Sequence, residues 1–157
     1  IINVNDKSNP IIMSSHPTSS NFTHNCWISN DGNTLFTTDE VSGAYIGAYD
    51  VSNIYDIENT DLIQSWSGFN NVVPHNTHVI GNYLVTSYYR DGVTIIDASD
   101  PYNLVEVAYF DTSPQYEGEG YEGCWGAYPY LPSGLILATD RQNGLHVLST
   151  TLDLINN

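Results

Sequence analysis

Short apolar segments alternate with polar turns along the whole chain, and the same succession returns at intervals of about 50 residues. It begins at residues 24–28 (HNCWI), returns at 75–79 (HNTHV), and returns in degenerate form at 123–127 (GCWGA). After each copy come a turn, an apolar strand, a polar pair, a further strand and a tail. Several short strands per repeat at this period are typical of a β-propeller blade.

The pattern therefore predicts an all-β fold of β-propeller type, with four-stranded antiparallel blades and about three blade equivalents. We expect a single domain over residues 1–157 whose blades cover approximately 1–21 (partial), 22–70, 71–122 and 123–157 (partial). Because a propeller needs about four to eight blades, we expect the chain to be part of a larger ring. An open stack, or a ring completed by another chain, is the alternative.

Within each repeat, turn signals such as Asn30-Asp31-Gly32 separate the apolar runs. The expected strands cover residues 24–28, 34–38, 45–51 and 62–66 in one repeat, 77–80, 83–88, 93–97 and 105–110 in the next, and 125–128, 135–139 and 145–149 in the last. Two cysteines, Cys26 and Cys124, lie in equivalent parts of repeats that are separated by a whole blade, so we expect two buried free thiols.

Charge narrows the choice of partners. The chain has 18 acidic residues, 3 Lys or Arg and a net charge of -15, so it repels nucleic acid and anionic membranes. No apolar run reaches the ~18 residues that span a bilayer. The acidity serves solubility in a salty or extracellular setting, or else binds divalent cations. With 12 Tyr and abundant Asn, Ser, Thr and Gly, the composition suits a secreted all-β protein.

Several segments resemble known bacterial sequences. Residues 91–112 (DGVTIIDASDPYNLVEVAYFDT) look like the LVIVD repeat, and residues 24–40, 74–92 and 123–145 resemble the choice-of-anchor B family of surface proteins. The resemblance implies an LVIVD-type propeller that is secreted or anchored at the cell surface. It also implies an association with sorting sequences such as those for type IX secretion. It implies no defined activity.

One group of residues suits a metal. His24 and His75 occupy equivalent positions, and polar pairs end the second strands at 39–40, 89–90 and 140–141. A hairpin returns each pair beside the start of its inner strand, so we expect Glu40 near His24 and Tyr89 near His75. Two imidazoles and a carboxylate suit Zn, Mn, Fe or Cu. The sequence thus predicts a divalent metal at His24, Glu40 and His75. Alternatively, each histidine bonds the backbone of its own blade.

Further polar and aromatic residues near the same strand ends form a candidate ligand-binding set: Asn25, Asn76, Tyr89, Arg90, Trp125 and Arg141. The aromatic members either stack on sugars or fill the wedge between blades. The two arginines either pair with Asp39, Glu40 or Asp140, or clamp an anion. We expect each arginine to reach a carboxylate and at least one to be well buried.

The chain has no Gly-x-Ser-x-Gly elbow, phosphate loop or dinucleotide fingerprint. We therefore expect a secreted or cell-surface, non-catalytic propeller that binds a protein or a carbohydrate. A further interpretation makes it cargo of a secretion machinery such as type IX. The alternative is a metal-dependent enzyme with a channel site built from His24, His75 and Glu40.

Overall fold

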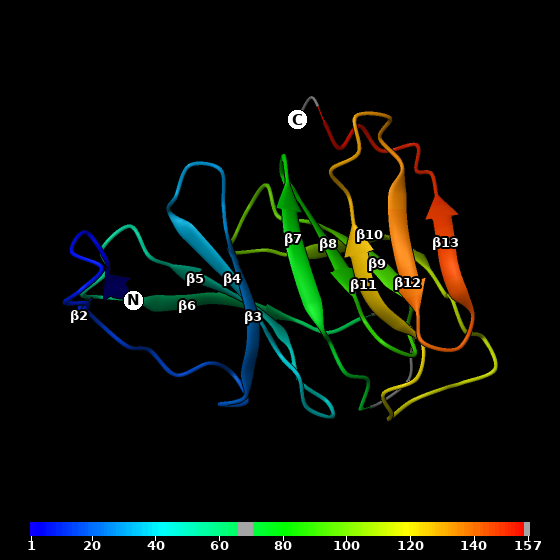
Figure 1. The fold of residues 1–157 in the computed structure, drawn as a ribbon, viewed down its shortest axis with the longest axis horizontal. Helices are drawn as coiled ribbons and strands as arrows, with labels where there is room; N and C mark the ends of the chain where they lie inside the picture. The colour runs from blue at the N-terminus through cyan, green and yellow to red at the C-terminus, as the bar shows by residue number, and fades with distance from the viewer. Residues whose placement is uncertain (66–70, 156–157) are drawn as a thin grey trace.

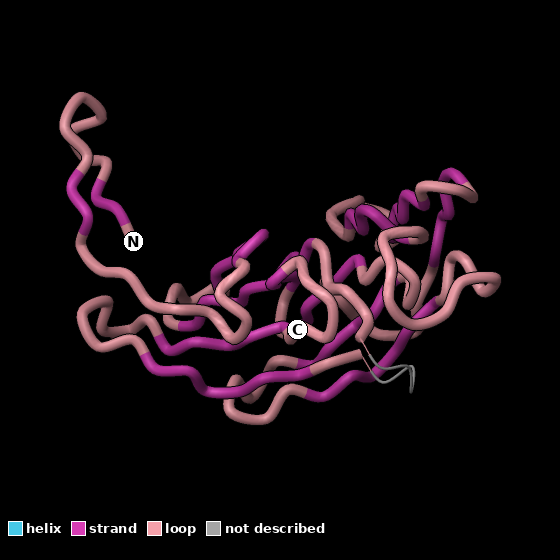
Figure 2. Tube along the Cα trace, turned by 90° about the horizontal axis from the view of Figure 1, so that it is seen from below, coloured by secondary structure: helices cyan, strands magenta, loops and turns pink. Residues whose placement is uncertain are grey.

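The computed structural model describes residues 1–65 and 71–155 and shows an all-β fold made of antiparallel sheets (Figure 1). A short hairpin pairs β1 (Ile2–Asn3) with β2 (Ile11–Ile12) and stands away from the other sheets in Figure 2. Two sheets have four strands and one has three, so the all-β class and the four-stranded antiparallel sheets are confirmed. Among the described residues the sheets do not close into a ring.

Each sheet is a simple meander in which chain neighbours pair. The first contains β3 (Thr23–Ile28), β4 (Thr34–Asp39), β5 (Ile46–Asp50) and β6 (Glu58–Ile63). The second contains β7 (Asn76–Ile80), β8 (Tyr83–Ser87), β9 (Val93–Asp97) and β10 (Val105–Phe110). The third contains β11 (Cys124–Tyr128), β12 (Ile136–Asp140) and β13 (Gly144–Leu148). The starting strands β3, β7 and β11 lie side by side, with β7 in the middle (Figure 1).

The fourth strand of the first sheet lies elsewhere than predicted. The sequence suggested residues 62–66, whereas β6 covers Glu58–Ile63 and pairs with β5 through a bulge between Ala48 and Tyr49. An outermost strand has a solvent-exposed face and tolerates polar residues, so a search for an apolar run misplaces it. The end of the predicted strand at Trp66, and the predicted blade boundaries at 70 and 157, lie outside the described residues.

Strands β8 and β9 of the second sheet are buried on both faces because this sheet lies between the other two, whereas its outer strand β10 is largely exposed. Along β8, Leu84 enters the core shared with the first sheet, and its neighbour Val85 enters the core shared with the third. Ile96 and Ile95 divide in the same way along β9, as the two-residue period of a strand requires. The buried thiol of Cys124 belongs to the second core, whereas Cys26 is exposed, so both thiols are free but only one is buried.

Two buried carboxylates tie the loops that precede the starting strands to the ends of the second strands. Asp39 accepts from the backbone N–H of Ser20 at 2.5 Å, ahead of β3. Asp140 accepts from the hydroxyl of Thr112 at 2.6 Å and from the backbone N–H of Asn143 at 2.7 Å. Hydrogen bonds to charged groups are among the stronger ones in proteins. The hydrogen bonds of Asp39 and Asp140 hold the loops in place at one end of the sheets, and the candidate site lies at that end.

Candidate functional site

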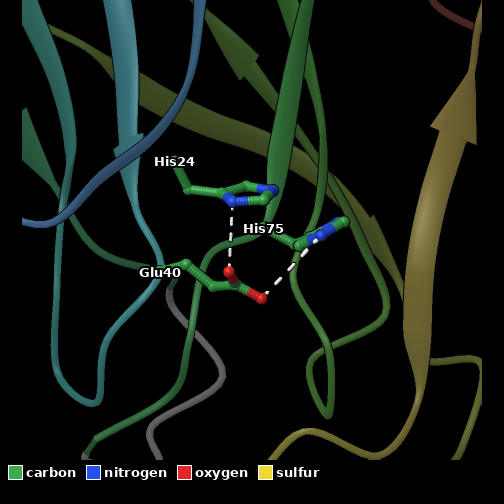
Figure 3. A group of neighbouring side chains, drawn as sticks. All are labelled: His24, Glu40 and His75. Carbon is green, nitrogen blue, oxygen red and sulfur yellow. Dashed lines mark ion pairs between the residues drawn. The ribbon is translucent and has the colours of Figure 1, made fainter.

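Two imidazoles and a carboxylate meet at this end of the sheets (Figure 3). Nδ1 of His24, on β3, lies 3.1 Å from Oε2 of Glu40, which directly follows β4. Nε2 of His75, directly before β7, lies 3.8 Å from Oε1 of the same carboxylate. The two imidazole rings stack with their centroids 4.5 Å apart. The structure therefore brings together the three residues that the sequence singled out.

The orientation of His75 is fixed by the backbone of the third sheet. Its Nδ1 lies 2.5 Å from the carbonyl oxygen of Trp125, and because a carbonyl only accepts, Nδ1 carries the proton. In the neutral ring, Nε2 then keeps its lone pair on the side of Glu40. His75 is 2% exposed, and this burial, together with the neighbouring His24, lowers its pKa against the opposing influence of Trp125 and Glu40. The neutral form is the one that binds metals.

The three side chains fit a divalent metal. Their ligand atoms all lie within 4.8 Å of one another, whereas tetrahedral ligands of one zinc ion, each about 2 Å from it, stand roughly 3.3 Å apart. Binding therefore draws the most distant atoms together by about 1.5 Å. The bond from Nδ1 of His75 to a backbone carbonyl is the support that metal-binding histidines ordinarily have.

Tyr89 completes the cluster through Glu40. Its hydroxyl donates to Oε1 of Glu40, and its ring contacts that of His75 at 5.1 Å. Burial, followed by the bond to Glu40, raises the pKa of Tyr89, so the phenol stays protonated and remains a donor. Its backbone has φ of 37°, a conformation that costs energy in a residue other than glycine. Reciprocal hydrogen bonds with the backbone of Cys124, at 3.1 and 2.8 Å, hold it there.

The strand register corrects one alignment of the repeats. The polar pair of the second repeat is Tyr88-Tyr89 rather than Tyr89-Arg90: Thr38 pairs with Asn25 and Ser87 pairs with the equivalent Asn76. Glu40 and Tyr89 thus stand at the same place, two residues beyond those pairs. Arg141 shares this place in the third sheet, because Thr139 pairs with Leu145 as Ser87 pairs with Val93. The sequence alone did not fix this alignment, because Tyr88 and Tyr89 are adjacent and identical.

Among the described residues, the prediction that each arginine reaches a carboxylate is confirmed for Arg90 and wrong for Arg141. Arg90 pairs with Glu122, through Nε at 2.9 Å and Nη2 at 2.6 Å, rather than with one of the expected acids. Arg141 donates to the carbonyl of Tyr121 and lies over the ring of Trp125, with Cζ 5.3 Å from its centroid. Arg90 is half-buried and Arg141 is exposed, so neither is well buried. The buried acids instead accept from backbone N–H groups and hydroxyls.

The remaining candidates divide between structural and accessible roles. Oδ1 of Asn25 accepts from the backbone N–H of Thr77 at 3.0 Å, so this side chain links β3 to β7. Asn76 is half-buried, and its backbone N–H donates to Ser87 at 3.2 Å. Trp125 is 47% exposed and contacts the ring of His75 at 5.1 Å. It presents an aromatic surface directly beside the cluster.

Two hydroxyl side chains that support the cluster were not predicted from the sequence. Thr38 donates to the carbonyl of His75 at 2.5 Å, and Ser87 donates to the carbonyl of Trp125 at 2.9 Å. They occupy equivalent positions, each opposite an asparagine of the neighbouring strand. The recurrence of a small hydroxyl residue just before each polar pair is the pattern that identifies them.

A cleft of about 240 Å³ lies at the opposite end of the strands, between the β3–β4 and β7–β8 turns. The titratable group in its lining is Asp31, whose carboxylate already accepts from Ser29 at 2.6 Å and from the backbone N–H of Asn33 at 3.1 Å. A single acid engaged in its own turn offers neither an acid–base pair nor a ligand set. The histidine cluster is therefore the stronger candidate.

No family model and no curated protein matches this chain. Its fold is similar to that of a solved protein from Bacteroides uniformis described as a "putative 6-phosphogluconolactonase", with a TM-score of 0.65 at 13% sequence identity. The similarity covers 92% of this chain and 43% of that protein, so the chain spans less than half of its length. At this identity the likeness shows the fold alone.

This comparison corrects the expectation of a non-catalytic surface protein that binds a protein or a carbohydrate. The similar fold belongs to a protein named as an enzyme. In the present protein, two imidazoles and a carboxylate lie in contact. The finding favours the alternative, a metal-dependent enzyme built on His24, His75 and Glu40.

Proposed function

We propose that this chain is part of a β-propeller-type, metal-dependent hydrolase whose metal centre is formed by His24, Glu40 and His75. The observation that carries the proposal is the convergence of three ligand atoms within 4.8 Å, with Nδ1 of His75 held by a carbonyl. The propeller arrangement is supported by the repeated meander sheets and by the similarity to a solved fold more than twice as long.

The residues of this chain have separate tasks at the centre. His24 and His75 supply nitrogen ligands, and Glu40 supplies oxygen, a set found in catalytic zinc sites. Tyr89 orients the carboxylate, and the carbonyl of Trp125 orients His75. A divalent metal held by these three residues would supply an activated water as the nucleophile, by lowering the pKa of that water to about 7.

Hydrolysis is the reaction class that this arrangement supports best, because activation of water needs no further cofactor. The name of the solved protein with a similar fold also denotes a hydrolytic enzyme, a lactonase. We therefore expect an ester or a lactone as the scissile group. Trp125, which is 47% exposed, offers a substrate an aromatic surface beside the cluster.

Zinc titration of the metal-stripped protein by isothermal calorimetry tests the proposal. We expect one zinc per chain in the wild type, loss of this binding in His75→Gln, and no change in His16→Gln. His16 is the matched control, since it is exposed and contacts Tyr49 away from the cluster. A panel of lactones and esters should be hydrolysed by the loaded protein and not after chelation. Equal zinc binding in all three proteins would overturn the metal centre.

A further inference from the structure

Among the described residues, Arg141 forms no ion pair within 4 Å, and its charge acts on Glu122 only from a greater distance. Its guanidinium donates to the carbonyl of Tyr121 and rests on the indole of Trp125. A guanidinium has five N–H donors and does not lose its proton in proteins. The nearby acid, Glu122, is engaged by Arg90, which places two nitrogens on one of its oxygens, at 2.6 and 2.9 Å. Most donors of Arg141 therefore remain available.

An exposed arginine without its own carboxylate is unexpected in this chain. The sequence has 18 acidic residues against 3 Lys or Arg, so acids greatly outnumber the cations that they might pair with. Chance placement on such a surface favours pairing. Arg141 instead stands where Trp125 fixes its plane, and stacking on an aromatic face leaves the in-plane N–H fork free for an oxyanion.

The position of Arg141 directs it toward the histidine cluster. In the strand register it is the equivalent of Glu40 and Tyr89 in the preceding sheets. Equivalent positions of successive blades face a common axis. The contacts agree: the ring of Trp125 lies 5.1 Å from that of His75 and 5.3 Å from Cζ of Arg141. The same indole thus contacts both the cation and a candidate metal ligand.

We infer that the substrate carries an oxyanion, a carboxylate or a phosphate, which binds Arg141 beside Trp125 while its scissile group reaches the centre at His24, Glu40 and His75. The placement of the scissile group at the metal centre rests on the proposed function, whereas the oxyanion subsite at Arg141 does not. A guanidinium fork binds two oxygens of a carboxylate or phosphate through parallel charge-assisted hydrogen bonds. The ligand is therefore small, anionic at one end and hydrolysable at the other.

The test is calorimetric titration of the metal-free full chain with inorganic phosphate and, separately, with acetate. We expect binding of at least one probe, weakened at least tenfold in Arg141→Gln and partly retained in Arg141→Lys, which keeps the charge but loses the fork. Lys7→Gln is the control, because it removes one positive charge from the remote N-terminal hairpin. The tighter probe identifies the oxyanion.

Two results would overturn the inference: no binding of either probe by the wild type, or equal weakening in Arg141→Gln and Lys7→Gln. A zinc titration of the same variants separates this inference from the metal centre. Arg141→Gln should keep the zinc affinity of the wild type, since Arg141 contacts none of the three ligands. Anion binding that depends on Arg141 in a protein without zinc affinity would sustain the subsite and defeat the proposed metal centre.

Discussion

Tyr89 shows at the scale of one residue how backbone geometry shapes the site. Its left-handed conformation turns the side chain away from the path of β8 and brings the hydroxyl to Glu40. Its amide and carbonyl are both engaged by Cys124, so the conformation is held by the third sheet. A strained residue at a cluster of polar groups is common at functional sites, where surrounding contacts over-determine it.

Replacing Tyr89 by phenylalanine removes this hydroxyl and keeps the ring. We expect the zinc affinity of Tyr89→Phe to fall about 10–100-fold, the usual effect of losing a group that orients a metal ligand. Thermal unfolding should change little, because the ring contacts with His75 and Tyr121 remain. Tyr55→Phe, at a position 68% exposed, is the matched control. An unchanged affinity would show that Glu40 needs no orientation.

His75 gives the metal-free protein a pH dependence of known sign. Its pKa is lowered in the folded state from an ordinary value of 6.5, so below that value the unfolded chain takes up a proton that the folded protein refuses. Stability then falls as the pH drops below about 6.5 and levels off below the folded pKa. Urea unfolding at pH 5 to 8 measures this slope. His75→Gln should reduce this slope without abolishing it, because burial also lowers the pKa of His78. An equal slope in both proteins would contradict the assignment.

At the scale of elements, the sequence predicted the first three strands of each sheet closely, because they alternate apolar residues between clear turns. It misplaced β6, where polar residues such as Asn59 pair with β5. The site shows the same division. His24, Glu40 and His75 were identified because a hairpin returns the end of one strand to the start of another. The alignment of Tyr89 with Arg141 depends on strand register, and the amino-acid sequence alone leaves that register uncertain by one residue.

Gly123 determines how closely β11 approaches Tyr89. A Cβ at this glycine would lie 2.3 Å from the Tyr89 carbonyl oxygen, and its φ is 91°. Gly32 has a similar φ of 77° with no atom within 4 Å of such a Cβ, so Gly32→Ala measures backbone strain alone. We expect Gly123→Ala to cost about 1–3 kcal/mol more than Gly32→Ala in chemical unfolding, and also to weaken zinc binding. Equal losses would mean that the approach is not constrained.

At the scale of the whole molecule, the excess of acids dominates the electrostatics. A net charge of -15 with 3 Lys or Arg means that repulsion between acids outweighs attraction within pairs. Salt screens repulsion beyond about 10 Å at 0.1 M. We expect the melting temperature to rise steadily between 20 and 500 mM sodium chloride, concentrations chosen to span roughly a threefold or larger change in screening length. A fall with salt would show that ion pairs dominate instead.

No helix within residues 1–65 and 71–155 is long and apolar enough to cross a membrane. The resemblance to LVIVD-repeat proteins and the extracellular location stay predictions. The sheets place equivalent residues of successive repeats at one end, and that placement, rather than any single motif, brings the ligand set together.

X-ray absorption at the zinc edge of the loaded protein tests the central claim most directly, because it reports the atoms bound to the metal. The account predicts nitrogen and oxygen ligands at about 2.0–2.2 Å with outer-shell scattering from two imidazoles, reduced to one imidazole in His24→Gln. A spectrum without imidazole scattering, or one that is identical in wild type and His24→Gln, would contradict a metal centre formed by His24, Glu40 and His75.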